Sequence, residues 1–200
     1  MLERNLQYAE RSYWDERFKT ERHFEWLTGF DNYNDVLLKR VSTTDDILHI
    51  GCGSSDLSIR LKDIGFSRIA NVDYSQDITS LATLPDASYD VVVEKATIEA
   101  LLVAEKSPWS PSDSALTTLD SVWAAVSRVL RPGGRFLSIS FTQPHFRLPA
   151  LLRNKDWGVT FEEFGSGFHF YLYECRKGAT TPAEVLQTAA LAKDWTRIVQ

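Results

Sequence analysis

Two glycines and one aspartate have a spacing that suits the binding of a nucleoside. The run ILHIGCGSSDL, positions 47–57, is an apolar strand pattern that ends at Gly51 and Gly53 and continues into a helix pattern. Because glycine has no side chain, its backbone can approach a ligand closely. Asp73 follows Gly51 by 22 residues, near the roughly 20 expected for an acid that binds ribose hydroxyls from the next strand. The spacing predicts a site for an adenosine-containing ligand.

Asp56 narrows the choice of ligand. The dinucleotide fingerprint would place glycine or alanine at this position, and a carboxylate there would repel a pyrophosphate at the helix N-terminus. S-adenosylmethionine carries adenine and ribose without a phosphate, so the residue favours that ligand. The alternative is a tight strand-to-helix turn with a surface aspartate. A nicotinamide-dependent enzyme is the least favoured function, because the sequence has no second catalytic constellation.

The elements that would position these residues alternate along the chain, which favours an α/β fold with a parallel sheet covered by helices. Leu119, Val122, Val126 and Val129 recur at helical spacing. Thr181 and Glu184, with Pro182, resemble a capping box that opens a last helix. The expected strands are 45–51, 67–75, 89–96, 135–141 and 168–177, the expected helices are 54–64, 114–130 and 181–195, and the expected turn is 131–134.

Composition indicates one ordinary globular domain. The chain has 200 residues, of which 44% are hydrophobic and 24% charged. A net charge of −5 argues against direct binding to nucleic acid, and two cysteines are too few for a disulfide framework or a four-ligand zinc site. The charged, aromatic start is unlike a signal peptide, and no window approaches a membrane span. We therefore expect a cytoplasmic protein that does not bind membranes.

Several segments together resemble the seven-β-strand, or class I, S-adenosylmethionine-dependent methyltransferases. They are ILHIGCGSSDLS, NVDYS, YDVVVEKATIEALL, VSRVLRPGGRFLSISF and GSGFHFYLY. The match is closest to the branch that methylates lysines of translation elongation factor 1-alpha, which includes a form made from the endothelin-converting enzyme 2 locus. The resemblance implies a Rossmann-like sheet with helices on both faces and a C-terminal antiparallel strand. It also implies a single domain, with an N-terminal helical lid (1–40), a catalytic core (41–178) and a C-terminal helix (179–200).

The resemblance implies the function as well. The chain would be a monomeric protein-lysine N-methyltransferase that uses S-adenosylmethionine as cofactor and elongation factor 1-alpha as substrate. Two alternatives remain open: an interaction module with a methyltransferase-like fold and impaired catalysis, and a methyltransferase for small molecules.

Nine cofactor-binding residues follow from the same resemblance. The glycine turn would support the methionine part, an acid after the second strand would hold the ribose, and aromatic residues of the N-terminal segment would cover the cofactor. The predicted set is Trp14, Phe18, Trp26, Gly51, Asp73, Tyr74, Asp77, Ile78 and Lys95.

The predicted role of the aromatic residues in covering the cofactor agrees with its charge. Aromatic faces attract a cation such as a sulfonium by about 0.5–2 kcal/mol. Trp14 and Phe18 are four residues apart and would share one helix face, which is also consistent with simple packing on the core. For Lys95, the alternative is a strand-end lysine that reaches solvent with Glu94 as a surface partner.

The predicted substrate-side residues are Glu99, Phe168, His169 and Tyr171, with Glu94 as a further wall candidate. No general base or other catalytic residue is identified. We expect no metal, because the histidines and cysteines lack ligand spacing, and we expect Cys52 to be a small filler between glycines.

The sequence departs from the family pattern after the second strand. A helix and an edge strand normally separate the ribose acid from the adenine-side acid, but here only two residues lie between Tyr74 and Asp77. A crossover to a parallel neighbour needs a dozen residues or more. The third strand and its helix are therefore expected to be missing, which places the adenine-side positions of Asp77 and Ile78 in question.

Overall fold

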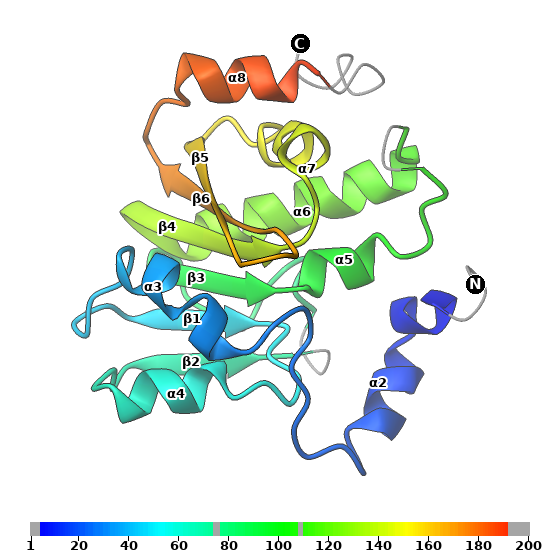
Figure 1. The fold of residues 1–200 in the computed structure, drawn as a ribbon, viewed down its shortest axis with the longest axis vertical. Helices are drawn as coiled ribbons and strands as arrows, with labels where there is room; N and C mark the ends of the chain where they lie inside the picture. Colours follow the sequence, from blue (N-terminus) through cyan, green and yellow to red (C-terminus); the bar gives the residue numbers. More distant parts are fainter. Residues whose placement is uncertain (1–4, 74–76, 108–109, 192–200) are drawn as a thin grey trace.

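The structure is a computed structural model that describes residues 5–73, 77–107 and 110–191. Within these ranges six strands form one sheet in the order β2-β1-β3-β4-β6-β5 (Figure 1). The strands β1, β2, β3 and β4 run parallel, whereas β6 is antiparallel to both β4 and β5. Their bounds are β1 (Ile47–Ile50), β2 (Ile69–Val72), β3 (Tyr89–Lys95), β4 (Leu130–Ser140), β5 (Trp157–Phe164) and β6 (Phe170–Lys177).

Helices cover both faces of the sheet, as expected (Figure 1). α3 and α4 pack on one face, while α6 and α7 pack on the other, where α8 lies against α7. The described helices are η1 (Leu6–Ala9), α2 (Arg11–Arg17), η2 (Phe30–Asn32), α3 (Asn34–Leu38), α4 (Leu57–Asp63), α5 (Thr97–Leu101), α6 (Asp113–Val129), α7 (Pro144–Leu151) and α8 (Ala183–Ala189).

The central strands are apolar on both sides because each side meets a different core. In β3, Val92 faces the core under α6, whereas Val91 and Val93 face the core under α4. Such double burial produces a continuous apolar run instead of the alternation of a half-exposed strand. No helix among the described residues is both long and apolar enough to cross a membrane.

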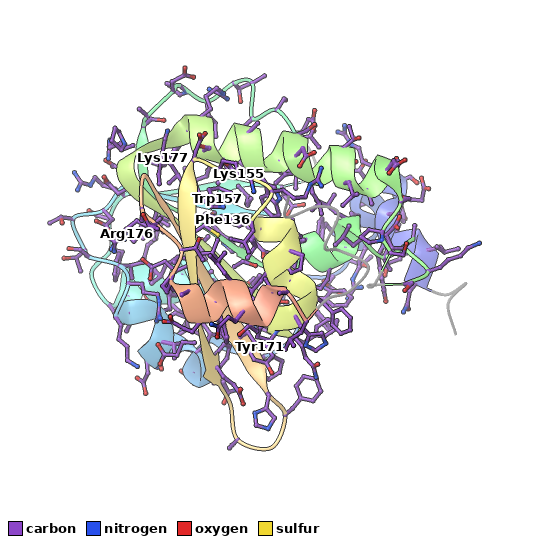
Figure 2. All side chains as sticks on the ribbon, turned by 90° about the horizontal axis from the view of Figure 1, so that it is seen from above. Phe136, Lys155, Trp157, Tyr171, Arg176 and Lys177 are labelled. Carbon is purple, nitrogen blue, oxygen red and sulfur yellow. The ribbon has the colours of Figure 1, made fainter. Side chains whose placement is uncertain are left out.

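Two tryptophans fix the position of α7, which matters for the site described below. The indole Nε1 of Trp123 donates to the carbonyl of Ala150, and that of Trp157 donates to the carbonyl of Leu151, each at 2.9 Å. Trp157 also stacks on Phe136, with ring centroids 5.9 Å apart (Figure 2). The last turn of α7 is thereby tied to α6 and to the antiparallel strands.

The interval between β2 and β3 contains only turns in its described part, residues 77–88. β2 is consequently an edge strand of the sheet. The six strands are consistent with the loss of one edge strand relative to the expected family pattern. Tyr74, one of the predicted cofactor residues, lies outside the described residues.

Several local expectations differ from the structure. The predicted turn at 131–134 is wrong, because β4 already begins at Leu130 and includes these residues. The strand pairing with β3 is irregular there, and Arg131 pairs with Asp90 at 2.5 Å, which keeps the segment against the sheet. β5 and the short helices α5 and α7 were not predicted from the sequence.

The predicted capping box is also wrong. α8 begins at Ala183 with Pro182 as its N-cap residue and no capping side chain. The Thr181 hydroxyl instead accepts a hydrogen bond from the Val159 N–H at 3.0 Å. It therefore joins the start of α8 to β5.

The turn after β1 gives a prediction about stability. Gly51 has φ +62°, and a Cβ there would lie 2.0 Å from Thr97 Oγ1, whereas Gly133 has φ +76° with open space around it. Ala at either position should suffer the backbone strain of about 1–2 kcal/mol. G51A should lose clearly more stability, because Thr97 must also move. Urea unfolding of both variants measures the difference, and equal losses would contradict the close packing at Gly51.

Candidate active site

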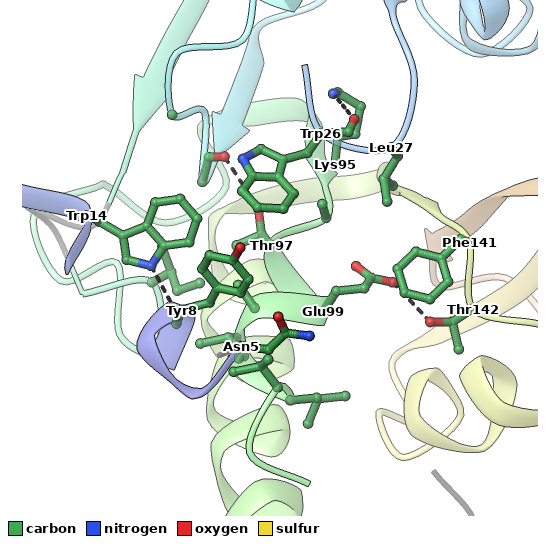
Figure 3. Close-up of a pocket in the computed structure, with 18 of the residues that line it drawn as sticks. Asn5, Tyr8, Trp14, Trp26, Leu27, Lys95, Thr97, Glu99, Phe141 and Thr142 are labelled. Carbon is green, nitrogen blue, oxygen red and sulfur yellow. Dashed lines mark hydrogen bonds between the residues drawn. The ribbon is translucent and has the colours of Figure 1, made fainter. Parts of the chain in front are cut away.

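A cavity of about 670 Å³ lies beyond the carboxyl ends of β1 and β3 (Figure 3). Its walls come from the glycine turn, the residues after β2, helix α5, helix α7 and the N-terminal segment, by which we mean residues 5–28. In open α/β sheets, ligands bind in this position, outside the carboxyl ends of the strands. The cavity brings together residues that are far apart in the sequence.

The glycine turn is held against the residue predicted to bind ribose. The Gly51 N–H donates to the Val72 carbonyl at 2.7 Å, and the Gly53 N–H donates to the Asp73 carboxylate. Gly51 and Asp73, two of the predicted cofactor-binding residues, both line the cavity. The turn and the acid therefore form one unit across the ends of β1 and β2.

Cys52 lies in this turn and lines the cavity. Burial raises the pKa of its thiol to about 12, and the neighbouring Asp73 carboxylate acts in the same direction. The thiol is therefore neutral near pH 7, in agreement with its expected role as a small filler.

Aromatic side chains of the N-terminal segment form one wall of the cavity. Trp14, Trp26 and Tyr8 line it, and the Trp14 Nε1 donates to the Tyr8 carbonyl at 2.8 Å (Figure 3). Phe18 packs on Trp14, and its ring tip would lie 3.4 Å from a Cβ on Gly53. Phe18 is thus a packing residue over the glycine turn and is not among those that line the cavity.

These aromatic rings already surround a cation of the chain itself. The Arg17 guanidinium carbon lies 5.0 Å from the Trp26 ring centroid and 4.9 Å from that of Phe24. Arg17 also pairs with Glu21 at 2.5 Å, and Glu21 accepts a hydrogen bond from Ser54 at 3.0 Å. One use of the aromatic faces is therefore to fix the N-terminal segment on the glycine turn.

Lys95 is buried, with its side chain only 2% exposed, and binds the N-terminal segment. Its Nζ lies 2.6 Å from Glu25 Oε2, 2.6 Å from the Trp26 carbonyl and 3.4 Å from the Thr28 carbonyl. The alternative of a solvent-directed lysine paired with Glu94 is therefore wrong. Lys95 lines the cavity, but its three donors already have partners within the chain.

Glu25 completes this contact. Its carboxylate also accepts hydrogen bonds from the Asp56 N–H at 2.6 Å and from Ser55 Oγ at 3.1 Å. Burial opposes ionisation of Glu25, but the hydrogen bonds from Lys95 and Asp56 outweigh it and lower the pKa of the carboxyl. Glu25 is therefore ionised and joins the N-terminal segment, β3 and the start of α4.

Ligand atoms of His23, Glu25 and Asp56 lie within 4.8 Å of one another, a grouping that suits a cation. The Glu25 carboxylate in this group is already held by Lys95, at 2.6 Å. The expectation of no metal stays a prediction.

A second buried network lies at the other end of the cavity. Glu99 Oε1 accepts hydrogen bonds from Ser140 Oγ, from an Arg147 guanidinium N–H and from Thr142 Oγ1, the last at 3.1 Å. Glu99 Oε2 is buried and has no hydrogen-bond partner among the described residues. Glu99 and Phe141 both line the cavity (Figure 3). This end therefore offers an unused hydrogen-bond acceptor.

Glu94 lies beneath this network and is completely buried. It accepts hydrogen bonds from Ser138 Oγ and from the Thr97 N–H, the latter at 2.9 Å. Burial, and after it the nearby Glu99 carboxylate, raises the pKa of Glu94 to about 7. Glu94 is not among the cavity-lining residues, so the structure does not place it at the wall.

Asp77 and Ile78 line the cavity despite the short interval that precedes them. Hydrogen bonds from the Thr79 hydroxyl at 2.6 Å and the Thr79 N–H at 2.9 Å lower the pKa of Asp77. Asp77 thus remains ionised and stabilises its own turn, while Ile78 packs against the core.

Three predicted substrate residues do not reach the cavity. Phe168 is 62% exposed in the turn between β5 and β6, and His169 pairs with Glu163 in the same hairpin. Tyr171 is buried within β6, opposite Ser140 of β4. The structure therefore does not bring these residues to Glu99, and only Glu99 of the predicted substrate-side set lines the cavity.

Sequence reasoning missed Tyr8, Phe141 and Arg147, all of which line the cavity. Phe141 directly follows β4, so its place at a strand end was a usable signal. Arg147 lies in α7, which the sequence pattern did not indicate.

No protein-family model matches the sequence, but whole-length relatives do. EEF1A lysine methyltransferase 4 of Mus musculus is 35% identical over 213 aligned residues, covering 94% of this chain and 83% of the relative. The Bos taurus protein of the same name is 35% identical and covers 88% of this chain and 78% of its own length. The human eEF1A lysine and N-terminal methyltransferase is 32% identical over 70% of this chain, which spans only 22% of that protein.

Solved structures share the fold at low sequence identity. The N-methyltransferase NodS of Bradyrhizobium japonicum, solved with S-adenosyl-L-homocysteine, has a TM-score of 0.54 at 15% identity, over 84% of this chain and 98% of that one. The 1,6-didemethyltoxoflavin-N1-methyltransferase of Burkholderia thailandensis has a TM-score of 0.51 at 14% identity, over 84% and 87%. The expected Rossmann-like class I methyltransferase fold is thus confirmed. With its similarity to the two whole-length relatives, the chain belongs to the EEF1A lysine methyltransferase 4 family.

Proposed function

We propose that this protein transfers a methyl group from S-adenosylmethionine to a lysine of translation elongation factor 1-alpha. Membership of the family supports the reaction and the class of substrate. The observation that carries the proposal is that one cavity joins the Asp73–glycine unit at one end to Glu99 at the other. Its volume of about 670 Å³ lies within the range of small-ligand sites.

The residues of the first end suit a ligand that is an adenosine with a positive charge. Asp73 and Asp77 supply negative charge, while the positive charge of Lys95 is matched by Glu25 at 2.6 Å. This balance suits a sulfonium and disfavours a polyphosphate. Asp73 would accept from the ribose hydroxyls, Gly51 would allow close approach, and Trp14 with Trp26 would exclude water. S-adenosylmethionine, when bound, supplies an activated methyl group.

At the other end, Glu99 would hold the target amine. A lysine ammonium has three donors and no acceptor, so it complements the unpaired Oε2. Phe141 is 46% exposed and lines the same cavity as Glu99, where its ring would contact the lysine methylene groups (Figure 3). Access from an exposed aromatic rim favours a protein side chain over a fully enclosed small molecule.

The amine must lose a proton before it can react. With a reference pKa near 10.4, the neutral form costs about 4.6 kcal/mol at pH 7. Removal from water disfavours the ammonium and lowers that cost. No described residue is assigned as the general base. A cytoplasmic location, a monomeric state and the absence of nucleic-acid or membrane binding stay predictions from the sequence.

The decisive experiment incubates the protein with S-adenosylmethionine labelled on its methyl group and purified elongation factor 1-alpha. We expect label on a lysine of the factor. D73N, which keeps the shape of Asp73 but removes its charge, should weaken the binding of S-adenosylhomocysteine by about tenfold, the effect of one charge-assisted hydrogen bond. Calorimetry measures this binding. If the wild-type protein binds S-adenosylhomocysteine but transfers no methyl group to elongation factor 1-alpha, the proposed substrate is contradicted. If it does not bind S-adenosylhomocysteine, the alternative of an interaction module is favoured.

Glu99 gives a separate prediction for the acceptor end. E99Q replaces the carboxylate by an amide of equal size and should raise KM for elongation factor 1-alpha or lower kcat by about tenfold or more. Affinity for S-adenosylhomocysteine should remain near that of the wild type. F168A is the matched control on the exposed hairpin and should leave both quantities unchanged. Loss of affinity for S-adenosylhomocysteine in E99Q would contradict the assignment of Glu99 to the substrate-binding end of the cavity.

Glu94 gives a prediction for the dependence of stability on pH. Its folded pKa of about 7 lies above the ordinary value of 4.5, so the folded protein keeps a proton that the unfolded chain releases. The stabilising contribution is complete below pH 4.5 and is lost as the pH rises to 7. E94Q, whose amide cannot ionise, should therefore become more stable relative to the wild type across this window. Urea unfolding at several pH values tests this, and parallel curves would contradict it.

A further inference from the structure

His49 is a buried titratable side chain that the proposed reaction does not yet use. It lies in β1, is 1% exposed, and lines the cavity beside the glycine turn. It pairs with Val93 of β3 in the sheet register, and its other neighbours in β1, Leu48 and Ile50, are buried and apolar. A polar ring at this position requires an explanation.

Counting protons defines the tautomer of His49. Its Nδ1 lies 3.1 Å from Ser58 Oγ, and Ser58 Oγ donates to Asn71 Oδ1 at 2.6 Å. The serine hydroxyl has one hydrogen, which it gives to Asn71, so the hydrogen between His49 and Ser58 must belong to Nδ1. A neutral imidazole has only one ring hydrogen. Nε2 is therefore an acceptor.

The ring stays neutral at physiological pH. Burial, and after it the charge of Lys95, lowers the pKa of His49 to about 4, with Glu25 opposing the shift. Lys95 of β3 and Glu25 of the N-terminal segment are the charged groups that act on the ring, and they pair with each other at 2.6 Å. Ser58, which approaches from α4, is uncharged. A neutral acceptor thus lies next to an ion pair without net charge.

No described residue donates to His49 Nε2, although the ring lines the cavity. Polar groups inside proteins normally have a hydrogen-bond partner, so an acceptor on a cavity wall normally meets a ligand or water. Because Nε2 has only a lone pair to offer, it can bind an N–H or O–H group and would repel a carboxylate. We therefore expect a hydrogen-bond donor of a bound ligand next to Nε2 of His49.

The sheet order indicates which donor that is. β1 lies between β2, which leads to Asp73, and β3, which leads to Glu99. The end of β1 is thus between the proposed ribose end and the proposed methyl-acceptor end of the cavity. In S-adenosylmethionine the amino-acid part branches from the sulfonium between these two ends, and its only nitrogen is a protonated α-amine.

We infer that Nε2 of His49 accepts a hydrogen bond from the α-ammonium of the methionine part of the cofactor. This rests on the proposed function. It assigns His49, through Ser58 and Asn71, as a binding residue fixed in one tautomer by a chain of hydrogen bonds.

The test combines two ligands with two variants. The ligands are S-adenosylhomocysteine and its des-amino analogue, which keeps the carboxylate. In H49N the amide reaches only the position of Nδ1, whereas in H49Q its oxygen reaches the position of Nε2. By calorimetry, H49N should bind S-adenosylhomocysteine about tenfold more weakly and the des-amino analogue as well as the wild type does. H49Q should retain most of the affinity for both.

Equal weakening of both ligands in H49N would overturn the assignment, and so would unchanged binding of S-adenosylhomocysteine. Failure of the wild-type protein to bind either ligand would instead contradict the proposed function, so the two failures are distinguishable. Thermal unfolding of each variant checks that the buried substitution is tolerated.

Nuclear magnetic resonance of wild-type protein with nitrogen-labelled histidines provides a readout that needs no variant. His49 should show a protonated Nδ1 and an unprotonated Nε2 near neutral pH. Addition of S-adenosylhomocysteine should shift the Nε2 resonance toward lower frequency, as acceptance of a hydrogen bond requires, whereas the des-amino analogue should not. A protonated Nε2, or the same shift with both ligands, would overturn the assignment.

Discussion

The buried ion pair between Lys95 and Glu25 is the interaction on which the site depends. A buried ammonium is tolerated only if its charge and its hydrogen bonds are satisfied, and loss of one partner typically costs about 3–5 kcal/mol. Here Glu25 and two backbone carbonyls of the N-terminal segment satisfy Lys95. Because Glu25 also accepts from the Asp56 N–H, the same carboxylate fixes the segment to β3 and to the start of α4. The aromatic wall of the cavity is thereby positioned by electrostatics as well as by packing.

At the opposite end of the cavity the charged group is a carboxylate, Glu99, and neighbouring side chains likewise satisfy its charge and the hydrogen bonds of one of its oxygens. Glu99 is held by Arg147 and by the hydroxyls of Ser140 and Thr142, while Arg147 is positioned by α7, whose last turn is tied to two core tryptophans. One carboxylate oxygen is fully used, and the other is free. These buried polar contacts hold the Glu99 carboxylate in place, and under the proposed function this fixed carboxylate would orient the incoming amine.

The shortened interval after β2 changes the edge of the sheet more than it changes the site. β2 is an edge strand, yet Asp77 and Ile78 still line the cavity beside Asp73. The reason is that the cavity is assembled around the ends of β1 and β3, whose pairing does not require a strand beyond β2. The relatives of the EEF1A lysine methyltransferase 4 family cover nearly the whole chain, so the similarity extends through both sides of this interval.

The sequence by itself determined the features that depend on neighbouring residues. Apolar runs predicted β1 and β3, and helical spacing predicted α6. The spacing of Gly51 and Asp73 predicted that these residues lie together, and both line the cavity, because strand, turn and next strand form a short contiguous unit. Tertiary structure alone decided the partners of buried charges. Glu25 meets Lys95 across 70 positions and Arg147 meets Glu99 across 48, so no local pattern records either pair. Tertiary structure also places Phe168 and His169 away from the cavity, because the direction of a hairpin depends on which strand it joins in the sheet.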